Sequence, residues 1–339
     1  MHNANMPRIG IIGAGAIGCM LAARFANAGC EVKLAARANA AAVIRESGVQ
    51  LIAFGTEMAA QITVIESPQE LLDLDYIFIA VKQQSLASAV RHWLPSLPCS
   101  VTVVPAINGI PWWFLSAIRK VSDPLEDVQG TELATLLPDA QILGAAVYLT
   151  AYSPTPGVAV QGTRNRIIIG ELDGTVTSRA TTLKMVCETA GMDCDISTSI
   201  CPDVWMKAAG NAVFNPLSVL SGADMAAMLA DDHISQLALS MLQESFELGQ
   251  RIGMQLAISP EEKLQQAQSA GNAQTSMLQD YLKGKPLEVE AIIGSIVKLG
   301  SRYEVEMPFT KAVYGLIQNA ALNNPFSTIK SNSTEEPTT

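Results

Sequence analysis

The sequence has little positive charge and no pattern of cysteines that would bind a metal. Lys and Arg number 22 against 32 Asp and Glu, which gives a formal net charge of −10. A field of this sign repels the phosphates of nucleic acids and anionic lipids, so we expect no nucleic acid and no membrane as a partner. The six cysteines lie far apart, without a C-x-x-C pair or nearby histidines, and predict buried free thiols with no metal site.

Targeting signals are also missing. Residues 1–8 are polar and show no export signal, and Gly, Lys or Asn interrupts each apolar stretch before it reaches membrane-spanning length. These absences predict a cytoplasmic protein. With 339 residues, of which 49% are apolar and 16% charged, the chain is typical of a globular protein with two domains.

The first part of the chain alternates strand and helix patterns. Residues 9–12 form a short apolar run, apolar residues then recur at helical spacing up to Phe25, and a second strand opens at Val32. Apolar runs at 76–81 and 101–106 predict further buried strands of a parallel sheet with helices on both faces. Shorter, partly exposed strands are expected at 157–162 and 166–170.

Strand patterns largely disappear after residue 200. Long periodic stretches rich in Ala, Leu and Met predict helices at 204–220, 234–252 and 287–300. We therefore predict an α/β protein in which a doubly wound parallel sheet is followed by an all-α domain. The expected division is residues 1–199 for the sheet domain, 200–326 for the helical domain and 327–339 for a disordered polar tail.

A glycine-rich turn joins the first expected strand to the first expected helix. Its residues are Gly13, Ala14, Gly15, Ala16, Ile17 and Gly18. In this setting Gly13 permits a tight turn, Gly15 lets a pyrophosphate approach the backbone, and Gly18 lets the helix pack closely on the strand. The N-terminus of the helix presents N–H groups to the phosphates. The turn predicts a Rossmann-type dinucleotide-binding domain.

Three polar residues follow predicted strands at the edge where open α/β sheets bind ligands. Arg37 ends the second strand where an NAD site would have an acidic residue, and an arginine suits the 2′-phosphate of NADPH. NADPH is therefore the expected cofactor. Lys82 is predicted to meet the cofactor phosphate or ribose, and Asn108 the nicotinamide or the catalytic acid. The alternative for each residue is an ordinary exposed side chain.

A polar stripe marks the helix predicted at 204–220. Lys207, Asn211 and Asn215 are spaced by four residues, which places them on one face of an otherwise apolar helix. Pro216 disfavours helix at Asn215, so we expect a local irregularity there. The stripe either faces solvent or carries chemistry. Reduction of a ketone needs a general acid, and since no histidine lies in a strand-end or pocket-like context, Lys207 is the best candidate.

Taken together, these residues resemble the ketopantoate reductase (2-dehydropantoate 2-reductase) family, from residue 9 to about residue 318. The motifs that carry the resemblance are the glycine turn, Val81-Lys82, Asn108-Gly109, Trp205-Met206-Lys207 with Asn211 and Asn215-Pro216, the run from Thr275 to Asp280, and Glu288-Val289-Glu290. The run Ser-Met-Leu-Gln-Asp with Glu288 twelve residues after Ser276 is the most specific. Without the family, Ser276 would be a helix cap and Glu288 a solvated carboxylate.

The resemblance implies NADPH-dependent reduction of 2-dehydropantoate to pantoate in pantothenate biosynthesis, in a cleft between the two domains. It implies that Lys207 is the general acid and that Asn211 and Asn215 bind substrate oxygen atoms. By the same resemblance, Ser276 binds the substrate carboxylate and Glu288 orients the substrate and the cofactor ribose.

The resemblance also places Arg37 and Lys82 at cofactor-binding positions. Asn108 would then position the nicotinamide and the catalytic lysine.

The sequence departs from the family at several positions. Ala273 stands where the family often has Asn, and Ser85 where it often has Gln. Trp112 and Trp113 add bulk beside Asn108, and residues 120–137 suggest a longer loop. A reductase of a different small 2-oxo or 3-hydroxy acid therefore stays an alternative, as does a non-catalytic NADPH sensor, and a homodimer is left open.

Overall fold

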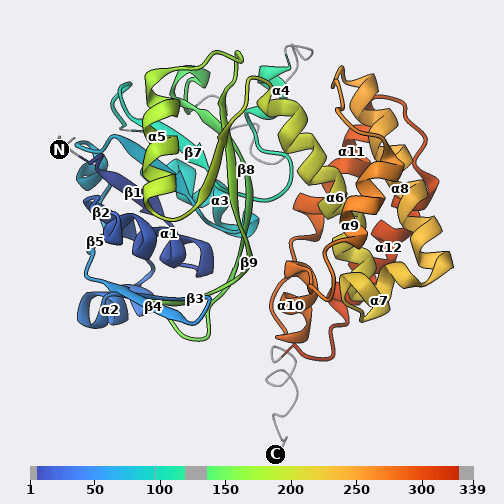
Figure 1. The fold of residues 1–339 in the computed structure, drawn as a ribbon, viewed down its shortest axis with the longest axis horizontal. Coiled ribbons are helices and arrows are strands. Elements are labelled where there is room, and N and C mark those ends of the chain that lie inside the picture. Colours follow the sequence, from blue (N-terminus) through green and yellow to red (C-terminus); the bar gives the residue numbers. More distant parts are fainter. Residues whose placement is uncertain (1–5, 96, 119–135, 328–339) are drawn as a thin grey trace, which may run out of the picture. The chain divides into compact units, whose positions relative to one another are not determined.

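The computed structural model describes residues 6–95, 97–118 and 136–327. The chain forms two compact units, Met1–Trp205 and Met206–Thr339 (Figure 1). Almost all of the predicted tail and of the predicted loop at 120–137 lies outside the described residues. Among the described residues, no helix is long and apolar enough to cross a bilayer.

The first unit contains a five-stranded parallel sheet in the order β5-β2-β1-β6-β7. Its strands are β1 (Ile9–Ile12), β2 (Val32–Ala35), β5 (Thr63–Ile65), β6 (Tyr76–Ile79) and β7 (Thr102–Pro105). In β1, β6 and β7 every residue is buried, as the apolar runs predicted. This central sheet and the helices between its strands confirm the Rossmann-type fold.

A second sheet completes this unit. It has the order β10-β9-β3-β4, and β8 pairs with β9. Its strands are β3 (Val49–Ala53), β4 (Thr56–Ala60), β8 (Leu143–Tyr152), β9 (Val158–Glu171) and β10 (Asp193–Ile196). The two strands expected at 157–162 and 166–170 are thus one long strand, β9. Its exposed middle residues, Thr163 and Arg164, look like a break in the sequence, yet the pairing with β8 continues on both sides of them.

The helices of the first unit connect and cover these sheets. They are α1 (Ala16–Asn27), α2 (Ala38–Ser47), α3 (Gln83–Trp93), α4 (Phe114–Ala117) and α5 (Ser178–Thr189). Helix α1 contacts strands of both sheets, which explains why it is buried nearly all round. Its Phe25 ring lies 5.2 Å from that of Phe78 in β6, so the core continues from helix to sheet.

The second unit is helical throughout its described residues. Its elements are the larger part of α6 (Ile200–Ser221), then α7 (Met225–Ala230), α8 (Asp232–Arg251), α9 (Pro260–Gln268), α10 (Ser276–Leu282), the π-helical turn η4 (Glu290–Gly294), α11 (Ser295–Arg302) and α12 (Pro308–Leu322). The expected irregularity at Asn215 was wrong, because α6 continues through both Asn215 and Pro216. Packing around this largely buried helix overrides the local preference of the residue before proline.

Candidate functional site

The glycine turn between β1 and α1 has the geometry of a dinucleotide site. Gly13 has a φ of +112°, and a Cβ there would lie 2.7 Å from the carbonyl oxygen of Ala80. A Cβ on Gly18 would lie 1.8 Å from the carbonyl oxygen of Gly13, so helix and strand meet too closely for a side chain. Close packing within the protein therefore explains both glycines without a ligand.

Gly15 is different from its neighbours. Its φ of −81° is open to any residue, and a Cβ there would meet nothing within 4 Å. No folding requirement explains this glycine, whereas a pyrophosphate close to the backbone would fill the space. Helix α1 starts at Ala16 without a side-chain cap, which leaves its first N–H groups facing that space. The residues of the turn therefore fit a bound dinucleotide.

The parallel sheet brings the other predicted cofactor residues to the same edge. β2 and β6 flank β1, and β7 follows β6, so Arg37, Lys82 and Asn108 all follow strand ends at the edge that carries the glycine turn. Arg37 and Lys82 are exposed and begin α2 and α3, while Asn108 is half-buried. The Nη2 of Arg37 donates to the Oγ of Ser85 at 3.0 Å, which ties the start of α2 to α3.

The two tryptophans after Asn108 pack inside the first unit. Trp112 and Trp113 are 2% and 0% exposed. A Cβ on Gly144 of β8 would lie 2.9 Å from the Trp113 ring, so this glycine makes room for the indole. Phe114 stacks on Trp205, with ring centroids 6.0 Å apart. These aromatics fill the core of the unit.

In the second unit, α6 carries the predicted polar stripe. Lys207 and Asn211 are half-buried, and Asn215 is only 5% exposed, so the stripe is not a simple solvent-facing surface. Gly210 lies in the interior of the same helix, and a Cβ there would be 3.2 Å from the Cε of Lys263 in α9. A second lysine therefore approaches α6. The sequence reasoning missed it, although a glycine inside a helix is a sign of close approach.

A hydrogen-bond chain links the stripe to α10. The Oγ of Ser218 donates to the carbonyl oxygen of Asn215 at 2.8 Å and shares a 2.6 Å hydrogen bond with Oγ1 of Thr275. Thr275 in turn caps α10 by accepting from the N–H of Leu278. Thus the cap is Thr275, and the alternative role of Ser276 as a helix cap was wrong. Ser276 is the first residue of α10 and is exposed.

Glu288 lies just before the π-helical turn η4 and is half-buried. Its carbonyl oxygen accepts a hydrogen bond from the N–H of Ile292 at 3.1 Å, and the bond typical of the π-helical turn follows from the N–H of Ser295 to the carbonyl oxygen of Glu290. Single π-helical turns occur often at functional sites. The sequence placed this region in a predicted helix but gave no signal of the π-helical turn.

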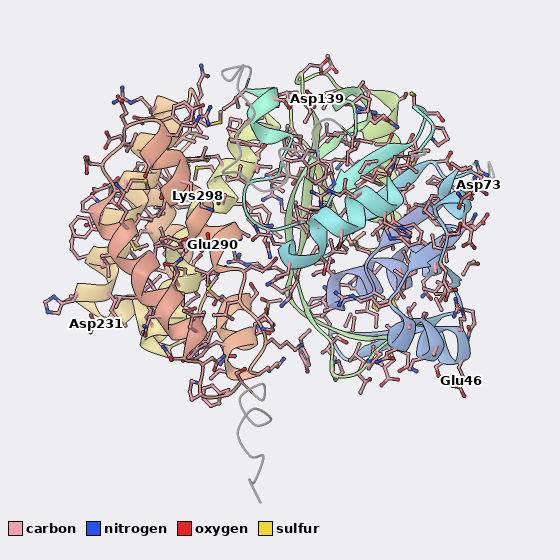
Figure 2. All side chains as sticks on the ribbon, turned by 180° about the vertical axis from the view of Figure 1, so that it is seen from behind. Glu46, Asp73, Asp139, Asp231, Glu290 and Lys298 are labelled. Atoms are coloured by element: carbon pink, nitrogen blue, oxygen red, sulfur yellow. The ribbon has the colours of Figure 1, made fainter. Side chains whose placement is uncertain are left out.

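The neighbouring Glu290 has a structural environment of its own (Figure 2). Its carboxylate accepts hydrogen bonds from Tyr314 at 2.5 Å and Gln318 at 3.0 Å, and Lys298 lies 3.4 Å away. Burial alone would raise the pKa of Glu290, but these hydrogen bonds outweigh it and lower the pKa below its usual value. Glu290 therefore joins η4 to α11 and α12.

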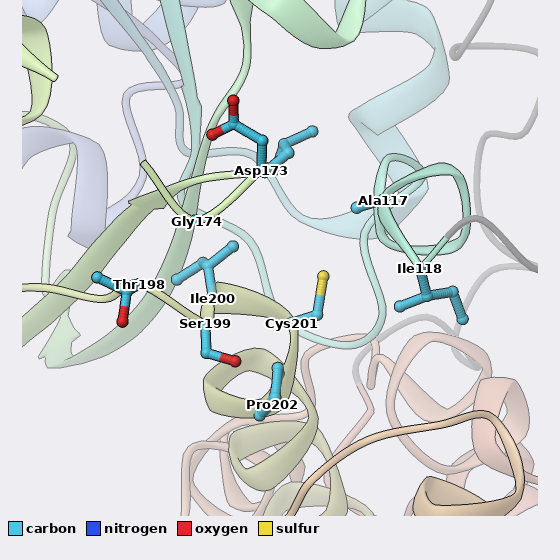
Figure 3. Close-up of a pocket in the computed structure, with 10 residues that line it drawn as sticks. Ala117, Ile118, Asp173, Gly174, Thr198, Ser199, Ile200, Cys201 and Pro202 are labelled. Carbon is cyan, nitrogen blue, oxygen red and sulfur yellow. The ribbon is translucent and has the colours of Figure 1, made fainter. Parts of the chain in front are cut away.

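One further hollow lies within the first unit, with a volume of about 200 Å³ (Figure 3). Its lining residues are Ala117, Ile118, Leu172, Asp173, Gly174, Thr198, Ser199, Ile200, Cys201 and Pro202. None of the predicted site residues lines it. Burial raises the pKa of the Cys201 thiol to about 12. The part of the chain that the structure describes contains no group of three or more side chains suited to a metal ion.

Two family models match most of the chain. Residues 9–174 match the family model described as ketopantoate reductase PanE/ApbA, and residues 199–321 match the model of its C-terminal part. The chain belongs to the ketopantoate reductase family.

Several relatives of this family resemble the chain over most of its length. The 2-dehydropantoate 2-reductase of Mesorhizobium japonicum is 32% identical over 93% of this chain and 98% of the relative. The enzyme of the same name from Archaeoglobus fulgidus is 25% identical over 92% and 97%.

Solved structures show the same fold. A putative ketopantoate reductase from Ralstonia solanacearum has a TM-score of 0.85 at 30% identity and covers 94% of this chain and 99% of its own. D-mandelate dehydrogenase with NADH and anilino(oxo)acetate has a TM-score of 0.80 at 20% identity, covering 93% and 99%.

Membership of the ketopantoate reductase family makes the chain an oxidoreductase, which removes the non-catalytic sensor from the alternatives. It also supports a nicotinamide cofactor and a small keto acid as the substrate.

Proposed function

We propose that this chain reduces 2-dehydropantoate to pantoate with NADPH, as a cytoplasmic enzyme of pantothenate biosynthesis. The observation that carries the proposal is the polar face of α6, where Lys207 and Asn211 are half-buried and Asn215 is connected through Ser218 to the start of α10. An amine and two amides on an otherwise apolar helix suit a polar substrate better than an apolar core. All six cysteines are free thiols, which supports the cytoplasmic location; five are buried as predicted, but the prediction was wrong for Cys99, which is exposed.

The proposed cofactor residues are Gly13, Ala14, Gly15, Ala16, Ile17, Gly18, Arg37, Lys82, Asn108 and Glu288. The N–H groups at the start of α1 bind the pyrophosphate, and Gly15 leaves room for it. Arg37 binds the 2′-phosphate. Lys82 binds cofactor phosphate or ribose, Asn108 orients the nicotinamide, and the bound nicotinamide supplies the hydride.

The proposed substrate residues are Lys207, Asn211, Asn215, Ser276 and Glu288. As hydride reaches the ketone carbon, negative charge grows on the carbonyl oxygen, and the ammonium of Lys207 donates a proton to it. Asn211 and Asn215 hold substrate oxygen atoms. Ser276, the exposed first residue of α10, binds the carboxylate. Glu288 orients the substrate hydroxyl and the cofactor ribose.

A second candidate is the reduction of a different small 2-oxo acid with the same residues. It is favoured by Ala273, whose methyl group replaces an amide that the family often has at that position. In this chain the backbone of Ala273 accepts a hydrogen bond from the N–H of Met225, so the position is held by the main chain and offers no polar side chain to a substrate. A smaller or differently substituted acid would need fewer polar contacts.

A steady-state screen of 2-oxo acids with NADPH and with NADH tests the proposal. We expect kcat/KM for 2-dehydropantoate to exceed that for pyruvate by about a hundredfold, because the larger acid makes contacts worth about 3 kcal/mol that pyruvate lacks. NADPH should have the lower KM of the two cofactors. If 2-dehydropantoate reacts no faster than pyruvate, the second candidate holds, and equal KM values for the two cofactors would remove NADPH from the proposal.

A further inference from the structure

The hydrogen bond between Arg37 and Ser85 crosses the mouth of the glycine turn. Arg37 follows β2 and Ser85 lies in the first turn of α3, after β6, and these two strands flank β1, which leads into the glycine turn. The Nη2 of Arg37 lies 3.0 Å from the Oγ of Ser85, although the residues are 48 positions apart. The pair therefore lies where the proposed site holds the adenosine end of a dinucleotide.

The direction of this hydrogen bond matters for what Ser85 can bind. A guanidinium group only donates, so the Ser85 oxygen accepts from Arg37 and keeps its own proton to donate. Arg37 retains four further N–H groups in a planar fork that suits a phosphate. Together the two side chains offer one full positive charge and a separately directed O–H donor. A phosphate monoester can use both, whereas a neutral ribose hydroxyl offers no charge to match them.

The nearby acidic residue and helix starts do not neutralise the positive charge of Arg37. Glu66, which follows the neighbouring strand β5, is paired with Arg45 at 2.6 Å. The first turns of α2 and α3 contain no acidic residue, and neither helix has a side-chain cap. Lys82 stands at the start of the same helix as Ser85. Negative charge is thus favoured at this corner of the sheet.

We propose that Ser85, held by Arg37, is a specificity-determining residue that binds the 2′-phosphate of the cofactor. The inference rests on the proposed function, since it deepens the choice of NADPH over NADH. This role also explains why a short serine can stand where the family often has the longer Gln. The serine hydroxyl already lies 3.0 Å from the guanidinium of Arg37, so a longer side chain is not needed there.

Equilibrium binding of 2′,5′-ADP and 5′-AMP to the full chain tests this without turnover. These probes differ only in the 2′-phosphate, and isothermal titration calorimetry measures both dissociation constants. For Ser85→Ala we expect the Kd of 2′,5′-ADP to rise about tenfold, the loss of one hydrogen bond to a charged group, while the Kd of 5′-AMP changes less than about twofold. Ser85→Thr keeps the hydroxyl and should bind 2′,5′-ADP almost as the wild type does.

A matched control is Ser88→Ala in the same helix. Ser88 is exposed and its hydroxyl donates to the backbone oxygen of Ser85 at 3.0 Å, so both dissociation constants should stay at the wild-type values. If the wild type prefers 2′,5′-ADP to 5′-AMP, and Ser85→Ala binds 2′,5′-ADP as tightly as the wild type does, the role of Ser85 is overturned while the preference for NADPH is supported. If the wild type binds both probes equally, NADPH and the role of Ser85 fail together.

Discussion

Lys207 combines a charged group with an apolar helix, and a half-buried ammonium group is costly there unless it is used. In the proposed mechanism this side chain acts as the general acid, while Asn211 and Asn215 on the same face of α6 bind the substrate. Removal of a general acid slows the chemical step, whereas removal of a binding contact weakens the ground-state complex.

For Lys207→Ala we therefore expect kcat to fall by about two to four orders of magnitude, the usual range for a general acid. The Kd of NADPH should change less than about twofold, because Lys207 contacts the substrate oxygen in the proposed site. Stopped-flow kinetics measure the first quantity and fluorescence titration the second. Lys311→Ala, an exposed lysine on α12, serves as the control and should leave both unchanged. Normal turnover in Lys207→Ala would remove this residue from the mechanism.

Among the structural elements, the junction of β9 and α5 contains the most buried ion pair of the first unit among the described residues. Glu171, 5% exposed at the end of β9, accepts hydrogen bonds from Nε of Arg179 at 2.7 Å and from its Nη2, and also from the hydroxyl of Thr177. Burial alone would raise the pKa of Glu171, but these hydrogen bonds lower it below its usual 4.5. Since the folded pKa is depressed, the stabilisation is present above pH 4.5 and is lost as the pH falls through the folded value.

Glu171→Gln should accordingly lower the free energy of unfolding by about 2 kcal/mol at pH 7, because Arg179 loses its charged partner. The difference from the wild type should shrink as the pH falls below 4.5, because the carboxylate of the unfolded wild type then takes up a proton before that of the folded protein. Urea unfolding between pH 3 and 7, roughly the range over which carboxyl groups titrate, measures this. Asp195→Asn is the control, because Asp195 and Arg166 are both 53% exposed and their pair should contribute at most about 1 kcal/mol. A constant difference at every pH would contradict the assignment.

Local patterns predicted the regular elements well and the exceptions poorly. The βαβ unit followed from the apolar runs and the spacing of the glycines, and the structure gives a steric reason for Gly13 and Gly18. The merged strand β9 and the continuous helix at Pro216 did not follow, because pairing with β8 and burial of α6 override local breaks. Thr275 and Ser276 are adjacent hydroxyl residues, and either could cap a helix. The sequence does not show at which of them α10 begins, so Ser276 was predicted as the cap in place of Thr275.

Contacts between distant segments were the hardest part of the site to predict. Ser218 and Thr275 are 57 residues apart, and Ser218 belongs to none of the motifs that the sequence displays. The approach of Lys263 to Gly210 depends in the same way on how α9 packs against α6. A periodic pattern identifies which face of a helix is buried but not which residue of another helix it meets. Contacts of this kind between distant segments can be identified only from the tertiary structure.

For the whole molecule, cofactor binding and folding are linked, and the glycine turn separates the two effects. A ligand that binds only the folded state stabilises it by RT ln(1 + [L]/Kd), about 2.7 kcal/mol at a hundredfold excess over Kd. A substitution that prevents cofactor binding removes only this cofactor-dependent stabilisation. A substitution that disturbs packing lowers the stability of the cofactor-free protein. Gly15 and Gly18 lie three residues apart and fall into these two classes.

Gly15→Ala should leave the Tm of the free protein within about 2 °C of the wild type, because its backbone is extended and its Cβ meets no atom of the chain. Saturating NADPH should no longer raise that Tm, since the methyl group occupies the space of the pyrophosphate. Gly18→Ala should lower the Tm of the free protein by several degrees, because its Cβ would collide with the carbonyl of Gly13. Differential scanning calorimetry with and without NADPH distinguishes the two. If Gly15→Ala were stabilised by NADPH as fully as the wild type, the open space at Gly15 would not be the pyrophosphate site, and the cofactor would have to bind elsewhere on the chain.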